Sequence, residues 1–204
     1  MTLLNLKKFY KNKKVLVIGH TGFKGSWLTA SLKGLDAKVF GLSKDIPTYP
    51  SNFKVSKIHK NITDFKVDIR NYKLLKKKIK LIKPDLIFHL AAQSLVKKSF
   101  LYPYETWTTN SIGTLNLLEI IREINFKKKL GIVIITSDKC YKNINQKKGY
   151  KETDILGDKE PYGSSKASAE LIFYSYFHSF FSKNKMLSLA TARAGNVIGG
   201  GDWS

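Results

Sequence analysis

The 204-residue chain has a single cysteine, Cys140, and lacks any apolar run that could span a bilayer. One cysteine excludes an internal disulfide framework, and no cluster of ligand side chains accompanies it, so no metal is expected. The longest apolar runs, at 86–92 and 131–135, are far shorter than the roughly 20 residues of a membrane helix. The N-terminal segment lacks the features of a signal peptide. We therefore expect a cytoplasmic protein without a membrane partner.

Acidic residues are scarce, with 15 Asp and Glu against 36 Lys and Arg and a net charge of +21. Such a charge raises nucleic acid as a candidate partner. However, the basic clusters at 76–78, 127–129 and 147–148 fall at expected helix ends and loops, without interleaved aromatic residues that could stack on bases. We therefore expect no nucleic-acid partner. A positive field would also favour anionic ligands such as dinucleotides and sugar nucleotides.

Short apolar segments alternate with helical segments along the chain, without internal repeats or low-complexity linkers. This alternation predicts one α/β domain over residues 1–204, a Rossmann-type doubly wound parallel sheet in three α/β/α layers. The expected strands are 14–18, 37–42, 65–68, 85–91, 131–136 and 187–193. The expected helices are 26–34, 72–82, 104–124 and 162–181, and residues 43–63 are expected to form an extended excursion.

A glycine-rich turn, GHTGFKG at 19–25, lies between the first expected strand and helix. Glycines there permit a tight turn, let the backbone approach a pyrophosphate and let the helix pack on the strand. The phosphates would then lie on free N–H groups at the helix N-terminus. The turn therefore predicts dinucleotide binding. Its expected cofactor contacts are Gly19, Thr21, Gly22, Phe23, Lys24 and Gly25.

The end of the second strand leaves the choice between NAD and NADP open. A ribose-binding acid is expected about 20 residues after the glycines, but the chain has Ser43 and Lys44 there, with Asp45 following. Ser43, an expected cofactor contact, and Lys44 could instead tolerate a 2′-phosphate. Asp68, followed by Ile69, could accept a hydrogen bond from adenine or could cap the next helix.

Small side chains end the fourth strand and would let a cofactor lie across the strand ends. The expected contacts in this region are Leu90, Ala91, Ala92 and Gln93, together with Asn110 in the helix expected over 104–124. His89 lies inside the fourth strand, where a core histidine is a better interpretation than a catalyst.

Two further segments predict an oxidoreductase centre. Thr136-Ser137-Asp138-Lys139 ends the fifth strand, at the sheet edge where open α/β sheets bind ligands. Tyr162 and Lys166 open the following helix and, being four residues apart, share one face. We expect the Lys166 ammonium to lower the pKa of the Tyr162 phenol, which could then remove a hydroxyl proton while Ser137 hydrogen-bonds the same oxygen. Tyr-x-x-x-Lys alone is usually an ordinary helix start, so the prediction depends on its combination with the glycine turn.

The segments GHTGFKGSW, DIR, FHLAAQ, TSDKCY, YGSSKASAE and RAGNVIGGGDW together resemble the extended short-chain dehydrogenases/reductases, and more narrowly the CDP-glucose 4,6-dehydratases. The similarity runs from about Val15 to the end of the chain. The resemblance implies a tightly held NAD and CDP-glucose as the sugar-nucleotide substrate. It also implies that Tyr162 deprotonates the sugar 4-hydroxyl while hydride leaves C4, that water is lost across C5 and C6, and that hydride returns to C6.

The same resemblance assigns roles at the strand end, where related dehydratases carry Thr-Asp-Glu. Asp138 would protonate the departing 6-hydroxyl. Lys139 replaces the glutamate that takes the C5 proton, and it is a plausible base only if burial or Lys166 depresses its pKa. Besides these catalytic residues (Tyr162, Lys166, Ser137, Asp138 and Lys139), the expected substrate contacts are Gln93, Ser137, Arg193 and Asn196, with the 199–203 loop at the border.

The family also implies a homodimer, in which the helices expected over 104–124 and 162–181 form a four-helix interface with a second copy. Family members continue well past residue 204, so the chain is expected to be an N-terminal part that lacks most of the substrate domain and could be inactive alone. Two alternatives stay open. One is another sugar-nucleotide epimerase or dehydratase on this scaffold, and the other is a catalytically silent nucleotide-binding module.

Overall fold

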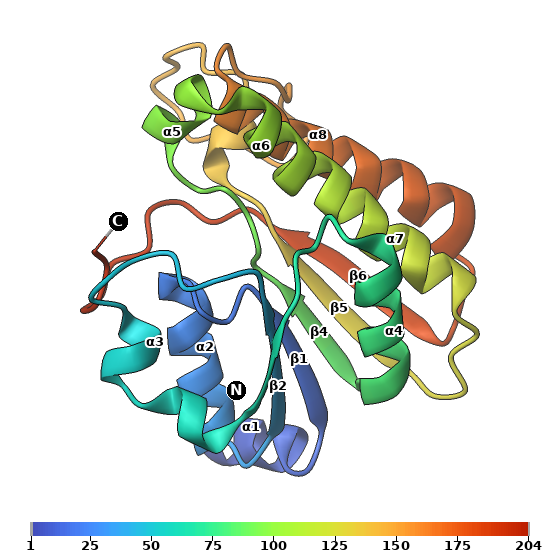
Figure 1. The fold of residues 1–204 in the computed structure, drawn as a ribbon. Coiled ribbons are helices and arrows are strands. Elements are labelled where there is room, and N and C mark those ends of the chain that lie inside the picture. The colour runs from blue at the N-terminus through green and yellow to red at the C-terminus, as the bar shows by residue number, and fades with distance from the viewer. Residues whose placement is uncertain (1, 204) are drawn as a thin grey trace.

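A computed structural model describes residues 2–203 and contains a six-stranded parallel sheet in the order β3-β2-β1-β4-β5-β6 (Figure 1). The strands are β1 (Lys14–Ile18), β2 (Lys38–Ser43), β3 (Thr63–Lys66), β4 (Leu86–His89), β5 (Leu130–Ile135) and β6 (Leu187–Ala192). The strand order reverses between β1 and β4. Ligands of open α/β sheets bind above such a reversal, at the carboxyl ends of the strands.

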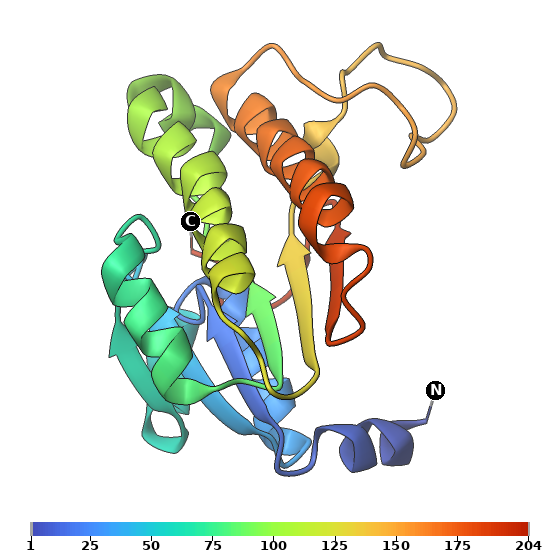
Figure 2. The same ribbon diagram turned by 90° about the vertical axis from the view of Figure 1, so that its right-hand side faces the viewer.

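Helices cover both faces of the sheet. They are α1 (Leu3–Tyr10), α2 (Phe23–Gly34), α3 (Asn52–Val55), α4 (Tyr72–Ile82), α5 (Val96–Leu101), α6 (Pro103–Trp107), α7 (Gly113–Glu123) and α8 (Pro161–Tyr176). Short 3₁₀ segments, η1 (Ile58–Asn61) and η3 (Asp138–Cys140), and π-helical turns, η2 (Thr108–Ile112) and η4 (Phe177–Phe181), complete the described elements. Figures 1 and 2 show α4, α7 and α8 side by side on one face and α2 on the other. The predicted three-layer Rossmann fold is confirmed.

Alternate residues of β1 supply the two halves of the core, because successive side chains of a strand point to opposite faces. Leu16 and Ile18 pack with α4 and α7, whereas Val15 and Val17 pack with Leu32 of α2. These four of the five β1 residues are at most 2% exposed. A strand buried on both faces is typical of a parallel sheet with helices on each side.

Coverage is thinner at the β6 edge. Leu187 and Leu189 pack against the core beneath α7 and α8, whereas Ser188, Ala190 and Ala192 on the opposite face are exposed. No described helix lies over that part of the sheet, so β6 is both an edge strand and a half-covered one.

Several predicted boundaries were wrong. The helix predicted from residue 26 begins at Phe23, because the glycine turn already has helical geometry there. The predicted excursion over 43–63 contains α3 and η1, which have four residues each and are too short to show a helical pattern of apolar residues. The helix predicted over 104–124 is α6, η2 and α7 in succession, and α1 and α5 were not predicted.

Candidate functional site

Two glycines shape the turn between β1 and α2. Gly19 has a φ of 92°, and a Cβ there would lie 2.6 Å from the Ala91 nitrogen. A Cβ on Gly25 would lie 2.0 Å from the Gly19 carbonyl oxygen. Gly22 differs, because its Cβ would make only an ordinary contact, at 3.5 Å from the Gly19 oxygen. Close packing against the backbone explains why positions 19 and 25 require glycine. At Gly22 the packing does not require glycine, and the missing side chain leaves space for a ligand to approach the backbone.

The same turn fits the pyrophosphate of a dinucleotide. Gly22 is the N-cap of α2 and provides no side-chain acceptor, so the N–H groups of the first helical turn are available to an anion. Lys24 adds a positive charge there. Burial lowers the pKa of Lys24, and the nearby Asp138 carboxylate partly opposes this shift. The glycine turn and the end of β5 are therefore close enough for their charges to interact.

A buried histidine ties this turn to the two strands beside it. The His20 Nδ1 lies 2.9 Å from the Ser43 hydroxyl, and Nε2 lies 2.8 Å from the Asp64 carboxylate. The Ser43 hydroxyl also accepts the Thr21 N–H at 3.3 Å. Burial lowers the pKa of His20, and Asp64 opposes the shift. Ser43, predicted to contact the cofactor, uses its hydroxyl to brace the turn.

Sequence reasoning missed His20, although one signal could have found it. Gly41 stands inside β2, where glycine indicates that another group approaches the backbone closely. A Cβ on Gly41 would lie 2.4 Å from the His20 ring, and Phe53 packs edge-on against that ring at 5.0 Å.

Asp68 is held by a neighbouring arginine. Its Oδ1 accepts the Arg70 backbone N–H at 2.9 Å, and Oδ2 accepts Arg70 Nη2 at 2.6 Å. These contacts lower the pKa of Asp68, with the Arg70 side-chain hydrogen bond as the main cause. The alternative that Asp68 caps the next helix is wrong, because the cap of α4 is Asn71. A contact of Asp68 with adenine stays a prediction, while Ile69 is buried in the core.

The end of β4 is joined to α8 through Asn110. The Asn110 side chain accepts the Gln93 N–H at 2.8 Å and donates to the Gln93 carbonyl at 3.0 Å. It also donates to the Ser165 hydroxyl at 2.9 Å. Asn110 lies in the π-helical turn η2, a geometry often found at functional sites. The Gln93 amide nitrogen donates to Thr106 and Leu95, so the side chain predicted to contact cofactor and substrate has partners within the protein.

The other predicted residues in and just after β4 fall into two groups. Leu90, Ala91 and Ala92 are half-buried beside the glycine turn. His89 is buried, with Nε2 3.3 Å from the Thr114 hydroxyl, and burial lowers its pKa to about 3. The interpretation of His89 as a core residue is confirmed, because its side chain is buried and bonded to Thr114 inside the protein.

Ser137, Tyr162 and Lys166 meet at the carboxyl end of β5. The Ser137 side chain neighbours the Tyr162 phenol and acts to lower its pKa, and Lys166 Nζ donates to the Ile135 carbonyl at 3.2 Å. Tyr162 and Lys166 are 8% and 7% exposed. The Lys24 charge contributes to the electrostatics of Lys166. The structure thus brings the serine, the phenol and the ammonium to the edge of the sheet that carries the glycine turn.

The expected lowering of the Tyr162 pKa is wrong for this structure. Burial raises the pKa of Tyr162, Asp138 and Glu160 raise it further, and only the Ser137 side chain opposes the shift. Lys166 directs its ammonium at a carbonyl of β5, and burial lowers its own pKa to about 8. Burial therefore raises the Tyr162 pKa, whereas the four-residue spacing to Lys166 had predicted that the pKa would fall.

Asp138 and Lys139 extend from the same strand end and are exposed. The Ser137 hydroxyl donates to Asp138 Oδ1 at 3.1 Å and accepts the Lys139 N–H at 3.2 Å. Burial was one condition for Lys139 to act as a base, and within residues 2–203 that condition is not met.

Gly163 and Glu160 position the start of α8 next to the end of β5. A Cβ on Gly163 would lie 2.6 Å from the Lys139 carbonyl oxygen. The Glu160 carboxylate caps the helix by accepting the N–H groups of Tyr162 at 2.6 Å and of Gly163 at 2.5 Å. Sequence reasoning missed Glu160, although an acid directly before Pro161 is a recognisable helix start.

The predicted substrate contacts near the end of the chain differ in their surroundings. Arg193 is bonded to Glu170, Tyr141 and the Glu152 carbonyl. Asn196 is exposed. The segment that follows crosses α2, where Trp27 Nε1 donates to the Gly200 carbonyl at 2.9 Å. Arg193 is thus part of an internal network, while Asn196 remains accessible.

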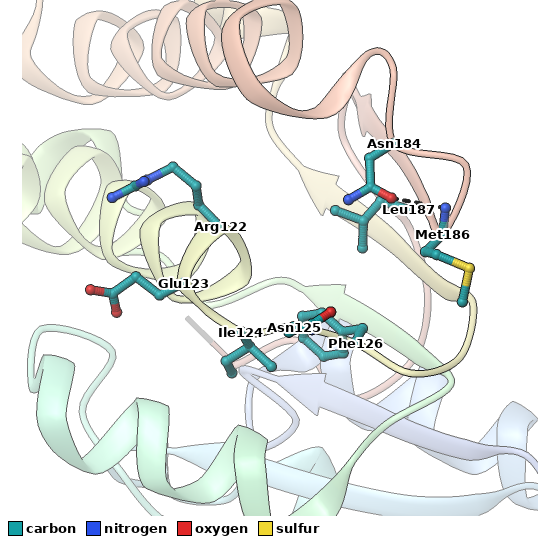
Figure 3. A pocket seen from close by; sticks show the side chains of 8 residues that line it. All are labelled: Arg122, Glu123, Ile124, Asn125, Phe126, Asn184, Met186 and Leu187. Atoms are coloured by element: carbon teal, nitrogen blue, oxygen red, sulfur yellow. Dashed lines mark hydrogen bonds between the residues drawn. The ribbon is translucent and has the colours of Figure 1, made fainter.

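A separate pocket lies at the opposite end of the sheet, between the end of α7 and the loop before β6 (Figure 3). It is lined by Arg122, Glu123, Ile124, Asn125, Phe126, Asn184, Met186 and Leu187. It contains none of the predicted site residues. Among residues 2–203, no group of three or more His, Cys, Asp or Glu side chains is arranged to hold a metal ion. None of the described helices combines the length and apolarity needed to cross a membrane.

Comparison with known proteins identifies similar sequences. The family model described as GDP-mannose 4,6 dehydratase matches residues 16–189. CDP-glucose 4,6-dehydratase of Salmonella typhimurium is 43% identical over 202 residues, covering 97% of this chain and 56% of that protein. GDP-mannose 4,6-dehydratase of Vibrio cholerae is 29% identical over 178 residues, covering 82% of this chain and 46% of the relative. The chain spans about half the length of these curated relatives.

Solved structures share the fold. Epimerase Mth375 of Methanothermobacter thermautotrophicus superposes with a TM-score of 0.78 at 29% identity, covering 97% of this chain and 55% of that one. UDP-glucose 4-epimerase of Thermus thermophilus, solved in complex with NAD, gives a TM-score of 0.75 at 27% identity over 88% of this chain and 54% of that one.

Proposed function

Because the chain belongs to the GDP-mannose 4,6 dehydratase family, we propose that its 204 residues form the NAD-binding and catalytic domain of a CDP-glucose 4,6-dehydratase. The observation that carries the proposal is the meeting of Ser137, Tyr162 and Lys166 at the edge of the sheet that also holds the glycine turn. The choice of CDP-glucose follows the 43% identity with the Salmonella enzyme.

NAD is the proposed cofactor and, when bound, would accept a hydride from the sugar and return it. The N–H groups after Gly22 and the charge of Lys24 would hold its pyrophosphate, and Asp68 would face its adenine. The half-buried Ala91 and Ala92 provide a flat surface across the strand ends. Tyr162 and Lys166 would hold the end of the cofactor nearest to β5.

Tyr162 is the proposed base for the sugar 4-hydroxyl. The proton moves from the hydroxyl oxygen to the phenolate oxygen, while Ser137 donates a hydrogen bond to the same sugar oxygen. In this structure the raised pKa keeps the phenol protonated, so a positive charge must approach it before it can accept a proton. Lys166 lies one turn along the same helix and is the side chain placed to supply that charge.

Asp138 is the proposed acid that protonates the departing 6-hydroxyl. Its carboxyl group is exposed at the sheet edge, and the Ser137 hydroxyl orients it from 3.1 Å. Lys139 is the proposed acceptor of the C5 proton, which leaves as water departs across C5 and C6. Both side chains reach the edge from one short segment, so they can act on neighbouring carbons of one sugar.

Epimerisation of a sugar nucleotide is the second candidate function. The exposure of Lys139 favours it, because a base in water is less effective at removing a carbon-bound proton. The fold neighbours include UDP-glucose 4-epimerases. An epimerase would use Ser137, Tyr162 and Lys166 in the same way and would not require Asp138 or Lys139.

Product analysis separates the two functions. The whole protein is incubated with NAD and, separately, with CDP-glucose, GDP-mannose, dTDP-glucose and UDP-glucose, and the products are identified by mass spectrometry and NMR. We expect loss of one water and a 4-keto-6-deoxy sugar from CDP-glucose. A change of sugar configuration without loss of water would refute the dehydratase and support the epimerase.

A homodimer through α7 and α8 is proposed as well. These helices lie side by side on one face of the sheet (Figure 2), and large apolar side chains remain exposed on or beside them, including Ile112, Leu171 and Tyr174. Burying such a face against a second copy would remove this apolar surface from water.

A further inference from the structure

An ion pair between a buried carboxylate, Glu170, and a half-buried guanidinium, Arg193, lies directly behind the catalytic strand end. The Glu170 carboxylate, which is 4% exposed, accepts Arg193 Nη2 at 3.0 Å. Neither side chain takes part in the proton transfers proposed above. A buried charged pair costs desolvation energy that apolar side chains of similar size avoid, so it is weak evidence for stability. The other contacts of the pair point to a different role.

Glu170 joins a helix to two strands. It lies on α8 one turn after Lys166 and two turns after Tyr162, and therefore on the same face of the helix. Its carboxylate accepts the Thr136 hydroxyl at the end of β5 and the Thr191 hydroxyl of β6, the latter at 3.1 Å. One side chain thus sets the separation between the helix that carries the phenol and the strand end that carries the serine.

The parallel ladder continues past the ends of β5 and β6. The Thr136 N–H donates to the Ala192 carbonyl at 2.9 Å, and the Asp138 N–H donates to the Ala194 carbonyl at 3.0 Å. Arg193 stands between these two acceptors. The position of the Asp138 backbone therefore depends on the segment that Arg193 anchors.

The Arg193 guanidinium is held from three directions. Besides Glu170, it donates to the Tyr141 hydroxyl at 2.9 Å and to the Glu152 carbonyl at 3.1 Å. It also lies over the Tyr141 ring, 4.9 Å from its centre. A planar group with several donors in a fixed geometry suits such a junction better than a lysine would.

We propose that Glu170 and Arg193 are positioning residues, which keep residues 136–138 in register with residues 192–194 and at a fixed distance from α8, so that Ser137 and Asp138 meet Tyr162. This inference rests on the proposed function for its effect on turnover. It also replaces the prediction that Arg193 contacts the substrate, because the guanidinium acts through the protein.

The charge of Glu170 has a second effect, on the lysine one turn away. Glu170 opposes the lowering of the Lys166 pKa, which burial and the neighbouring Lys24 cause, and Cys140 acts in the same direction as Glu170. Removing the carboxylate therefore shifts the Lys166 pKa further below about 8. The same side chain thus supports both the geometry and the charge of the centre.

The test compares three variants of the whole protein, namely Glu170→Gln, Arg193→Met and the double variant that carries both changes. Glu152→Gln is the matched control, because its exposed side chain lies outside the network while its backbone carbonyl is retained. Thermal stability, kcat and KM for CDP-glucose are measured for each. Arg193→Met leaves the buried Glu170 carboxylate without its ion-pair partner, and Glu170→Gln leaves the half-buried Arg193 guanidinium without a carboxylate. Each single variant should therefore lower stability, whereas the double variant should recover it.

Activity should not recover with stability. We expect kcat of the double variant to stay about 10- to 100-fold below the wild type, with KM changed by less than about threefold, because misplacement of reacting groups affects the reaction step. A double variant with both stability and kcat restored would overturn the proposal. A raised KM with an unchanged kcat would also overturn it and would restore Arg193 as a substrate contact. Should the double variant fail to fold, Arg193→Lys decides in its place: a stable protein with full kcat refutes the proposal, and one with the same loss of kcat supports it.

A titration without substrate separates this inference from the proposed function. The pKa of Tyr162 is measured by NMR with ¹³C-labelled tyrosine, and Tyr162→Phe assigns the signal. In Glu170→Gln the Ser137 side chain is displaced, so the Tyr162 pKa should rise further, whereas Glu152→Gln should leave it unchanged. If the wild type lacks dehydratase activity but this shift is seen, only the proposed function fails. An unchanged Tyr162 pKa in Glu170→Gln would overturn the positioning role.

Discussion

Replacing Lys166 with methionine should stabilise the fold while it abolishes proton transfer. Burial lowers the pKa of Lys166 from the ordinary value of 10.5 to about 8. A difference of this size corresponds to about 3 kcal/mol of unfolding free energy. Methionine has a similar length and no charge, and its main loss is the hydrogen bond to the Ile135 carbonyl, worth about 1 kcal/mol. We therefore expect a net gain of about 2 kcal/mol at neutral pH, or about 4–8 °C in Tm.

The pH dependence of this gain follows from the direction of the shift. Between about 8 and 10.5 the unfolded lysine binds a proton that the folded one has lost, so the stability of the wild type rises with pH in that window. The advantage of Lys166→Met should therefore be complete below pH 8 and should shrink as pH approaches 10.5. Thermal unfolding followed by circular dichroism at several pH values measures it.

An exposed lysine provides the control. Lys80→Met on α4 removes the same charge from the surface and should change stability by no more than about 0.5 kcal/mol at any pH. The reasoning would be refuted if Lys166→Met were less stable than the wild type at neutral pH, or if its advantage did not change between pH 7 and pH 10.

Four further predictions concern three glycines and the helix surface. Gly22→Ala should leave Tm unchanged but weaken NAD binding, measured by calorimetry, because its Cβ makes only an ordinary contact at 3.5 Å; equal affinity would contradict a pyrophosphate at this turn. Gly25→Ala should lower Tm or prevent folding, because its Cβ would lie 2.0 Å from a carbonyl oxygen. Gly41→Ala should destabilise the protein through the His20 ring, which lies 2.4 Å from the added Cβ, and a wild-type Tm would show that the ring can move. Leu171→Glu should yield monomers in sedimentation if α8 forms the dimer interface, and a monomeric wild type would exclude that interface.

Much of the site could be located from sequence because its parts are local. A glycine turn after an apolar strand, and a tyrosine and a lysine four residues apart, are each defined by a few consecutive residues. The rule that ligands bind at the carboxyl ends of parallel strands then places them at one edge. The helix over 72–82 was predicted with its observed boundaries, because Pro84 limits its end, while the cap at its start, Asn71, was found only in the structure.

Other parts of the site could not be predicted, because they depend on partners far away in the sequence. The brace formed by His20, Ser43 and Asp64 joins three strands whose register the sequence does not reveal. The same is true of the Glu170–Arg193 pair, whose members are 23 positions apart and whose glutamate also bonds Thr136 of a third element. Arg193 was predicted to face the substrate from the family resemblance, and only the structure shows its bonds to Glu170, Tyr141 and the Glu152 carbonyl.

The sequence by itself determined the order of the six strands and of the four longest helices packed on the sheet, the dinucleotide turn and the chemical identity of the groups at the sheet edge, since these follow from local pattern and residue type. Only the tertiary structure decided how those groups behave. The predicted lowering of the Tyr162 pKa failed because burial, which the whole fold creates, outweighs the effect of a lysine one helical turn away. Spacing along a helix shows which side chains can meet, whereas desolvation and long-range hydrogen bonds set their charge and orientation.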